Sequence, residues 1–284
     1  MERIAGMKIL VTGGGGQLGK AVVKELKSKG HEVVSTRRQD MDIAVEDEVR
    51  NILDKVVPDA VVHCAAYTNV DRAEEESAVC HRVNVCGTKY LVKWCGEHDT
   101  KFLYVSTDYV FSGEGTVPHG EEDEKNPLNI YGQSKHEGEE LVKKNLKKWY
   151  IIRTSWLYGE GDNFVTAILG RAKETGRLQV VNDQIGSPTY TEDLAAFLGE
   201  LIDTERYGIY HVTNEGECTR YEFACEILKQ ARIEARLSPV VTKEYPRKAV
   251  RPKNSRLGKE KLRKEGFAPL PHWKDALKRY MSSF

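Results

Sequence analysis

The tyrosine and the lysine of the segment Tyr-Gly-Gln-Ser-Lys, Tyr131 and Lys135, are four positions apart. On a helix this spacing places both side chains on one face, about one turn apart. A free phenol stays protonated at neutral pH and exchanges protons poorly there. A neighbouring ammonium group stabilises the phenolate and lowers the pKa of the phenol, so the pair is suited to acid–base chemistry. Thr107, which ends a strand-like run, could present its hydroxyl to the same substrate oxygen.

A run of four glycines, residues 13–16, follows an apolar segment and precedes a helical pattern. Glycine permits a tight turn, and it lets backbone N–H groups approach a pyrophosphate at the amino end of a helix. This context predicts a dinucleotide-binding loop. We expect its cofactor contacts to come from Gly13, Gly16, Gln17 and Leu18.

The second predicted strand runs into Thr36-Arg37-Arg38, and no acidic residue follows until Asp40 and Asp42. An acid at this point favours NAD, whereas an arginine accommodates the 2′-phosphate of NADP. Arg37 therefore either binds that phosphate, which favours NADPH over NADH, or is a solvated surface charge. Asp42 and Ile43 are placed to hold the adenine edge of either cofactor.

Strand-like and helix-like segments alternate through the first half of the chain. Predicted strands cover residues 8–12, 31–36, 59–65, 101–106 and 149–153, and predicted helices cover 17–29, 45–57, 74–97 and 131–147. Such alternation, with continuous apolar strands, favours a Rossmann-type α/β fold: a doubly wound parallel sheet with helices on both faces.

After about Tyr158 this rhythm changes. Helices are expected over residues 164–174, 192–202 and 221–231, extended segments over 178–181 and 208–212, and a turn over 186–189. We expect a cofactor-binding domain over residues 7–158, with 188–212 returning to it. Residues 159–187 and 213–284 would then form a smaller α/β C-terminal substrate lobe.

Composition excludes several classes of partner. Lysine plus arginine and aspartate plus glutamate both number 43, so no overall field steers the chain to nucleic acid or to an anionic membrane. No apolar run is long enough to cross a bilayer, and the amino terminus lacks the apolar region of a signal peptide. The six cysteines include no Cys-x-x-Cys pair, which predicts reduced thiols in the cytoplasm and no metal site. Met7 is the expected natural start, with residues 1–6 as an extension.

Several longer segments carry a resemblance to a known family. Thr-Gly-x-x-Gly-x-x-Gly from Thr12, Cys-Ala-Ala-Tyr-Thr from Cys64 and Asn-Val-x-Gly-Thr from Asn84 are similar to motifs of extended short-chain dehydrogenases. So is the segment that carries Tyr131 and Lys135. Ser-Thr-Asp-Tyr-Val-Phe from Ser106 and three further segments resemble the dTDP-4-dehydrorhamnose reductase family more narrowly. These are Arg-Thr-Ser-Trp-Leu-Tyr-Gly from Arg153, Asp-Gln-x-Gly-Ser-Pro-Thr from Asp183 and Arg-Pro-x-Asn-Ser from Arg251.

The resemblance implies hydride transfer from NADPH or NADH to the C4 carbonyl of dTDP-4-dehydro-6-deoxy-L-mannose, giving dTDP-L-rhamnose. It implies that Tyr131 donates the proton, that Thr107 hydrogen-bonds the carbonyl and that Lys135 holds the nicotinamide ribose. The cofactor would also contact Ala65, Ala66 and Tyr67. The implied substrate residues are Asp108, Tyr109, Trp156, Asn163 and Arg251.

Two of these assignments have an alternative. Trp156 would lie beside the sugar or pack in the core, and Arg251 would meet the diphosphate or remain a solvated loop charge. Asn84 is expected to bridge backbone rather than to take part in chemistry.

One position departs from the family pattern. Some bacterial members form a magnesium-linked dimer through a glutamate just after the glycine loop, and Ala21 occupies that position here. A methyl group cannot ligate magnesium, so a homodimer of this chain would need another interface.

Two rival functions remain open. A nucleotide-sugar epimerase or dehydratase would recycle a bound nicotinamide, but dehydratases usually carry an added acid pair, and only Asp108 follows Thr107. A non-catalytic regulator, like that of methionine adenosyltransferase, would not need the intact Thr107, Tyr131 and Lys135.

Overall fold

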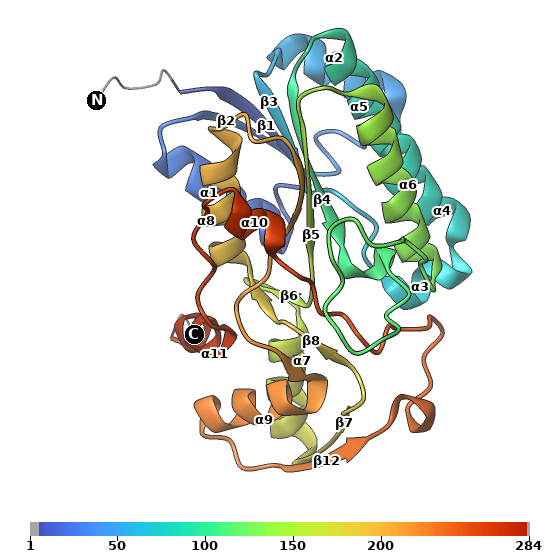
Figure 1. The fold of residues 1–284 in the computed structure, drawn as a ribbon, viewed down its shortest axis with the longest axis vertical. Coiled ribbons are helices and arrows are strands. Elements are labelled where there is room, and N and C mark those ends of the chain that lie inside the picture. Colours follow the sequence, from blue (N-terminus) through green and yellow to red (C-terminus); the bar gives the residue numbers. More distant parts are fainter. Residues whose placement is uncertain (1–5, 283–284) are drawn as a thin grey trace.

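Six strands form the central sheet of the molecule, and every neighbouring pair is parallel (Figure 1). The computed structural model describes residues 6–282, so the expected extension lies outside the described residues except for Gly6. In spatial order the strands are β10 (Gly208–His211), β5 (Trp149–Thr154), β4 (Lys101–Thr107), β3 (Ala60–His63), β1 (Lys8–Thr12) and β2 (Glu32–Thr36).

Helices cover both faces of this sheet (Figure 1). Successive strand residues point to opposite faces, so Ile9 and Leu10 belong to two different apolar clusters. The cluster of Ile9 lies under α1 (Gln17–Ser28) and α8 (Thr191–Ile202). The cluster of Leu10 lies under three helices: α2 (Glu46–Val56), α5 (Gly87–Glu97) and α6 (Ile130–Asn145). The predicted doubly wound parallel sheet is therefore confirmed.

The single helix predicted over residues 74–97 is wrong. The chain forms α3 (Val70–Glu75), α4 (Ser77–His81), a π-helical turn (Arg82–Cys86) and α5. Helix α3 begins early because the side chain of Asn69 accepts a hydrogen bond from the backbone N–H of Arg72, and non-helical dihedral angles at Glu76 separate α3 from α4. In the π-helical turn, Asn84 binds the backbone of Tyr67 through both its amide oxygen, at 2.7 Å, and its amide nitrogen, at 3.2 Å. Its expected bridging role is confirmed.

A smaller α/β lobe lies at the carboxyl end of the sheet (Figure 1). Its apolar cluster brings together Val165, Phe223 and Trp273. Two-stranded pairs form between β7 and β12, between β8 and β11, and between β6 and β9. The lobe elements are β6 (Leu157–Tyr158), α7 (Phe164–Thr175), β7 (Arg177–Val181), β8 (Ile185–Gly186), β9 (Thr189–Tyr190), β11 (Cys218–Thr219), α9 (Arg220–Ala231) and β12 (Arg236–Val240).

The turn predicted over residues 186–189 carries more structure than expected. Gly186 ends β8 and pairs with Cys218, and Thr189 begins β9 and pairs with Leu157. Two-residue strands have too little periodicity to be read from a sequence. Residues 189–211 then run through β9 and α8 into β10, the sixth strand of the central sheet. Short helices follow at α10 (Glu260–Lys264) and α11 (Trp273–Met281).

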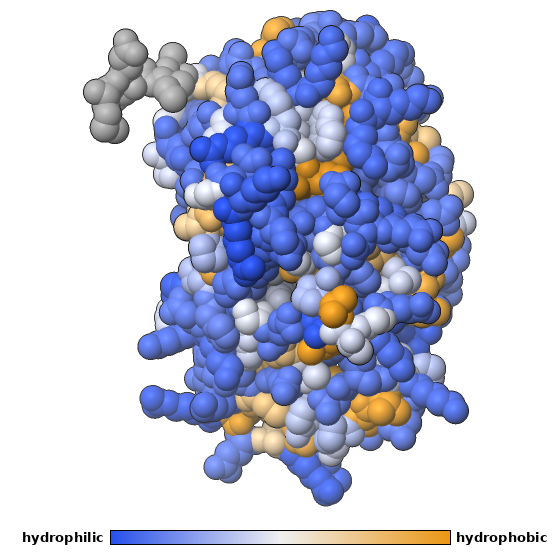
Figure 2. Space-filling view, viewed as in Figure 1, coloured by the Kyte–Doolittle hydropathy of each residue, from blue (hydrophilic) through white to orange (hydrophobic). Residues whose placement is uncertain are grey.

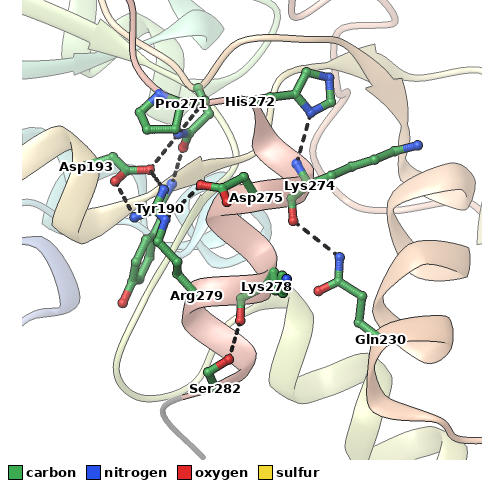
Figure 3. A network of polar contacts seen from close by, with 11 residues as sticks. Tyr190, Asp193, Gln230, Pro271, His272, Lys274, Asp275, Lys278, Arg279 and Ser282 are labelled. Carbon is green, nitrogen blue, oxygen red and sulfur yellow. Dashed lines mark hydrogen bonds and ion pairs between the residues drawn. The ribbon is translucent and has the colours of Figure 1, made fainter.

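An ion pair joins helix α11 to helix α8 (Figure 3). The guanidinium of Arg279 binds both carboxylate oxygens of Asp193, at 2.7 and 2.8 Å, and its Nε donates to Asp275 at 2.9 Å. The ring of His272 caps the helix by accepting a hydrogen bond from the backbone N–H of Lys274. These contacts join the last helix of the lobe to a helix of the central sheet.

The face shown in Figure 2 is mainly hydrophilic, and its apolar residues lie in small separate groups. Among residues 6–282, no helix combines the length and apolar character needed to cross a membrane. Those residues also contain no cluster of three or more histidine, cysteine or acidic side chains arranged to hold a metal ion.

Candidate active site

A cleft of about 570 Å³ lies at the carboxyl edge of the central sheet. The strand order reverses between β1 and β3, and parallel sheets bind ligands at such a point. All the predicted catalytic and cofactor residues line this cleft, together with three of the predicted substrate residues. They are Gly13, Gly16, Gln17, Leu18, Arg37, Asp42, Ile43, Ala65, Ala66, Tyr67, Thr107, Asp108, Tyr109, Tyr131, Lys135 and Trp156.

Tyr131 is positioned by the start of α6. Asn129 caps this helix by accepting a hydrogen bond from the backbone N–H of Gly132 at 2.8 Å. A Cβ atom at Gly132 would lie only 2.2 Å from the carbonyl oxygen of Tyr109, so glycine lets α6 approach this loop. The rings of Tyr109 and Tyr131 meet edge to face, with centroids 5.9 Å apart.

The electrostatics of Tyr131 differ from the sequence prediction. Burial raises the pKa of Tyr131 above its ordinary value, the Asp108 carboxylate adds to the rise, and a hydrogen bond with Thr107 opposes it. The expected lowering of the Tyr131 pKa by Lys135 is not found, and the Lys135 ammonium lies over the ring of Tyr104, 3.9 Å from its centroid. Burial lowers the pKa of Lys135 to about 7, against the opposing charge of a nearby carboxylate. In this structure the phenol keeps its proton, as a proton donor must.

Thr107 and Asp108 form a hydrogen-bonded pair at the end of β4. The Oγ1 of Thr107 donates to Oδ1 of Asp108 at 2.9 Å and accepts from the backbone N–H of Tyr109 at 3.2 Å. Burial raises the pKa of Asp108 to about 6, while hydrogen bonds from Ser255 and Thr107 oppose the rise. Asp108 is therefore mainly ionised at neutral pH, and its charge holds the Thr107 hydroxyl in one orientation.

The glycine loop fits a dinucleotide pyrophosphate. Gly13 has a φ of +68°, and a Cβ there would lie 2.6 Å from the backbone nitrogen of Ala65. A Cβ at Gly19 would lie 2.1 Å from the carbonyl oxygen of Gly13, so α1 packs directly against the loop. The amino end of α1 has no side-chain cap and no acid in its first turn. Its backbone N–H groups are therefore available to an anion.

The structure is compatible with both interpretations of Arg37, as a ligand of the 2′-phosphate and as a surface charge. Its exposed side chain donates from Nε to Asp40 at 3.0 Å, and the same residue lines the cleft beside the glycine loop. Asp42 accepts hydrogen bonds from the backbone N–H of Ala44 and from Arg38. An ion pair with Asp40 leaves part of the Arg37 guanidinium free for a phosphate.

A second cavity, of about 930 Å³, lies in the smaller lobe. Its lining has no carboxylate but contains six arginines: Arg171, Arg177, Arg220, Arg236, Arg247 and Arg251. Arg251 was expected near a diphosphate, and it lines this cavity while binding Asp71 through two hydrogen bonds of 2.8 Å. The other five arginines form no ion pair among the described residues, and such a concentration of positive charge fits an anionic ligand.

Asn163, expected as a substrate residue, lines neither of these two cavities. Its side-chain oxygen caps α7 by accepting from the backbone N–H groups of Val165 and Thr166. Its amide nitrogen donates to the carbonyl of Gly159 and to the hydroxyl of Tyr280. Both ends of the amide are thus engaged in holding the lobe together.

Trp156 combines both roles considered for it. It belongs to the apolar cluster of the lobe and also lines the catalytic cleft. Its φ of +49° is in the left-handed region, which is uncommon for a bulky residue. A Cβ at Gly186 would lie 2.8 Å from the indole, so glycine is needed beside it.

Sequence reasoning missed three residues around the cleft. Arg220 lies over Trp156, with its guanidinium carbon 3.7 Å from the ring centroid. Glu139 and Arg153 form a fully buried ion pair, and Glu139 accepts a hydrogen bond from Ser106, the residue before Thr107. The Thr219-x-x-Glu222 capping box could have placed Arg220 at the start of a helix, but no local signal predicts a pairing between residues 139 and 153.

Comparison with known proteins identifies the family. The family model described as the RmlD substrate binding domain matches residues 7–284. The chain belongs to this family. The spore coat polysaccharide biosynthesis protein SpsK of Bacillus subtilis is 42% identical over 275 residues, which cover 96% of each chain. The dTDP-4-dehydrorhamnose reductase of Aggregatibacter actinomycetemcomitans is 40% identical, covering 95% of this chain and 97% of that protein.

A solved structure shares the fold throughout. The dTDP-4-dehydrorhamnose reductase of Bacillus anthracis in complex with NADP superimposes with a TM-score of 0.95 and is 38% identical. The match covers 98% of this chain and all of that one.

Proposed function

We propose that this chain reduces the C4 keto group of dTDP-4-dehydro-6-deoxy-L-mannose with NAD(P)H, giving dTDP-L-rhamnose. The observation that carries this proposal is the meeting of Thr107, Tyr131 and Lys135 in one cleft with the glycine loop. The names of the family relatives and the NADP bound to one of them support the same reaction. The chain is then an NAD(P)H-dependent oxidoreductase.

The residues of the cleft divide the chemistry between them. Bound nicotinamide supplies the hydride. Tyr131 donates its phenolic proton to the oxygen of the former carbonyl, so that negative charge does not accumulate there. Its raised pKa keeps that proton available at neutral pH. The Thr107 hydroxyl, released from Asp108, hydrogen-bonds the same oxygen.

Lys135 is assigned to the cofactor ribose. Because its pKa is about 7, its charge state is sensitive to any anion or hydroxyl placed beside it. A ligand that forms hydrogen bonds with the ammonium favours the protonated form. We therefore expect the cofactor to stabilise the charge of Lys135 close to Tyr131.

The substrate is assigned to the junction of the two cavities. The arginine-lined cavity, with no carboxylate in its lining, suits the nucleoside diphosphate, while Tyr109 and Trp156 in the catalytic cleft suit the sugar. In this assignment residues 7–158 and 188–212 hold the cofactor, apart from β6 and β9, which pair with each other in the smaller lobe. Residues 159–187 and 213–284 hold the nucleotide sugar. Asp108 holds the Thr107 hydroxyl until the substrate oxygen replaces the carboxylate as its hydrogen-bond acceptor.

Two further assignments accompany the reaction. Arg37 beside the glycine loop favours NADPH over NADH, and the free cysteines of the described chain suit a cytoplasmic enzyme. Ala21 is buried under α8 and offers no magnesium ligand, so we propose no magnesium-linked dimer.

The proposal is tested by mixing the purified protein with dTDP-4-dehydrorhamnose and following loss of NADPH or NADH absorbance. We expect one cofactor oxidised for each dTDP-rhamnose formed. Turnover of a nucleotide sugar with tightly bound nicotinamide and no net cofactor loss would identify an epimerase or dehydratase instead. Copurification of a methionine adenosyltransferase, with no turnover of any keto-sugar, would identify a regulatory subunit.

A further inference from the structure

Arg220 occupies the junction between the two cavities. It is the first residue of α9, where Thr219 and Glu222 form a capping box that fixes the backbone. Its half-buried side chain lines both the arginine-rich cavity and the catalytic cleft. None of the other five arginines of the first cavity lines the second. A ligand that extends from one cavity into the other must therefore pass Arg220.

Arg220 forms no ion pair within the described part of the chain, although the carboxylate of Asp108 acts on its charge from beyond that distance. Arg251 in the same cavity binds both oxygens of Asp71, whereas no carboxylate lies within ion-pair distance of Arg220. Its side chain makes no hydrogen bond there, while its backbone N–H donates to the carbonyl of Gln184. Burial lowers the pKa of Arg220, but a guanidinium stays protonated in proteins. Five N–H donors and a full positive charge are left for a ligand.

Aromatic rings hold the guanidinium in place. Its central carbon is 3.7 Å from the centroid of Trp156 and 5.3 Å from that of Phe164. Stacking of this kind fixes the plane of an arginine while its N–H groups still point outward along that plane. Trp156, in turn, is held by Gly186 and by its own left-handed backbone. The position of Arg220 is thus coupled to that of the indole in the catalytic cleft.

We propose that Arg220 binds the sugar-linked phosphate of the nucleotide sugar and, through its stacking, positions Trp156 against the sugar. This inference rests on the proposed function, because it takes a nucleoside diphosphate sugar as the ligand. The nucleoside and its first phosphate lie among the other arginines of the large cavity. The second phosphate lies at the junction, where a planar, unpaired guanidinium can bind two of its oxygens. Arg220 is thus a positioning residue for the sugar rather than a proton donor.

Two nucleotides distinguish the contributions of the two phosphates to binding: dTDP carries both phosphates, and dTMP carries only the first. Their affinities are measured by calorimetry on the protein with saturating NADP⁺. We expect Arg220→Met to weaken the binding of dTDP by at least about tenfold, through loss of charge-assisted hydrogen bonds. The affinity for dTMP should stay within about twofold of the wild-type value. Lys229→Met, which removes an exposed charge from the same helix, is the matched control.

Arg220→Lys distinguishes charge from stacking. An ammonium can still bind the phosphate but cannot lie flat on an indole. We therefore expect Arg220→Met to lower both the dTDP affinity and kcat, and Arg220→Lys to restore the dTDP affinity but not kcat. In a double-mutant cycle on kcat, Arg220→Met and Trp156→Phe should together cost less than the sum of their separate losses. Additive losses would overturn the positioning role.

Three outcomes would overturn the assignment. Equal losses of affinity for dTDP and dTMP would show that Arg220 contacts the nucleoside or its first phosphate. No loss of affinity for either nucleotide would show that Arg220 does not contact the ligand. In both cases turnover by the wild-type protein would leave the proposed function intact. If the wild-type protein neither binds dTDP nor reduces the keto-sugar, the proposed function itself fails and the role of Arg220 fails with it.

Discussion

The guanidinium of Arg153 binds both carboxylate oxygens of Glu139, at 2.7 and 2.9 Å, at a place where neither side chain reaches solvent. The Oγ of Ser106 donates to the same carboxylate at 2.5 Å. Ser106 precedes Thr107 on β4, Arg153 is on β5, and Glu139 follows Lys135 by one turn on α6. This pair therefore connects the strand of Thr107 to the helix of Tyr131 and Lys135.

Breaking this ion pair should destabilise the protein strongly. Arg153→Met leaves a buried carboxylate without its partner, which typically costs about 3–5 kcal/mol of the free energy of unfolding. The double variant Glu139→Leu/Arg153→Met, measured by denaturant unfolding, should recover part of that loss, because the buried carboxylate is removed together with its partner, whereas Lys135 loses the charge that favours its protonated form. A double variant as unstable as the single one would show that the pair contributes more than charge compensation.

The buried Lys135 should make stability depend on pH. Its pKa in the folded chain is about 7, below the ordinary lysine value, so folding is penalised wherever the unfolded chain carries the proton. The penalty is complete below pH 7 and is relieved as the pH rises from there toward the ordinary lysine pKa. Lys135→Met should thus be more stable than the wild type at pH 6, and by less at pH 9, in unfolding experiments without cofactor. A gap that is constant with pH would contradict the lowered pKa.

Gly186 should be required by Trp156. A Cβ there would lie 2.8 Å from the indole and 3.1 Å from the Cβ of Ser255, so Gly186→Ala must move the ring. We expect a loss of about 1–3 kcal/mol in stability, as for other overpacked sites, with a higher KM for the nucleotide sugar. Gly170→Ala is the matched control, because a Cβ there meets no atom within 4 Å inside α7. If Gly186→Ala and Gly170→Ala had the same stability and the same KM, a steric conflict between residue 186 and the indole would be ruled out.

Arg37 should decide the choice of cofactor. Arg37→Ser removes the charge beside the glycine loop, so we expect kcat/KM with NADPH to fall by roughly tenfold while that with NADH stays nearly constant. Arg50→Ser, on the exposed side of α2, serves as the control for loss of a surface arginine. Equal losses with both cofactors would mean that Arg37 acts only through its ion pair with Asp40.

The sequence patterns predicted the sheet and most of the cleft because both depend on local signals. An apolar strand followed by glycines, or a tyrosine and a lysine on one helical face, can be recognised without any knowledge of the tertiary structure. The break at Glu76 and the cap formed by Asn163 were missed because they depend on competition between side-chain and backbone hydrogen bonds. The position of Lys135 over Tyr104 and the pairing of Glu139 with Arg153 depend on packing between distant segments. Periodicity carries no information about such contacts.

In the proposed reaction, Tyr131 supplies the proton that completes hydride transfer. The most direct measurement compares NADPH oxidation with dTDP-4-dehydrorhamnose by Tyr131→Phe and by the wild type. Tyr207→Phe serves as the control, because the Tyr207 hydroxyl has no hydrogen-bond partner among the described residues. We predict a loss of kcat of at least ~100-fold for Tyr131→Phe, in the usual range for a general acid, with NADPH affinity unchanged and the control fully active. A Tyr131→Phe enzyme as active as the wild type would contradict the account.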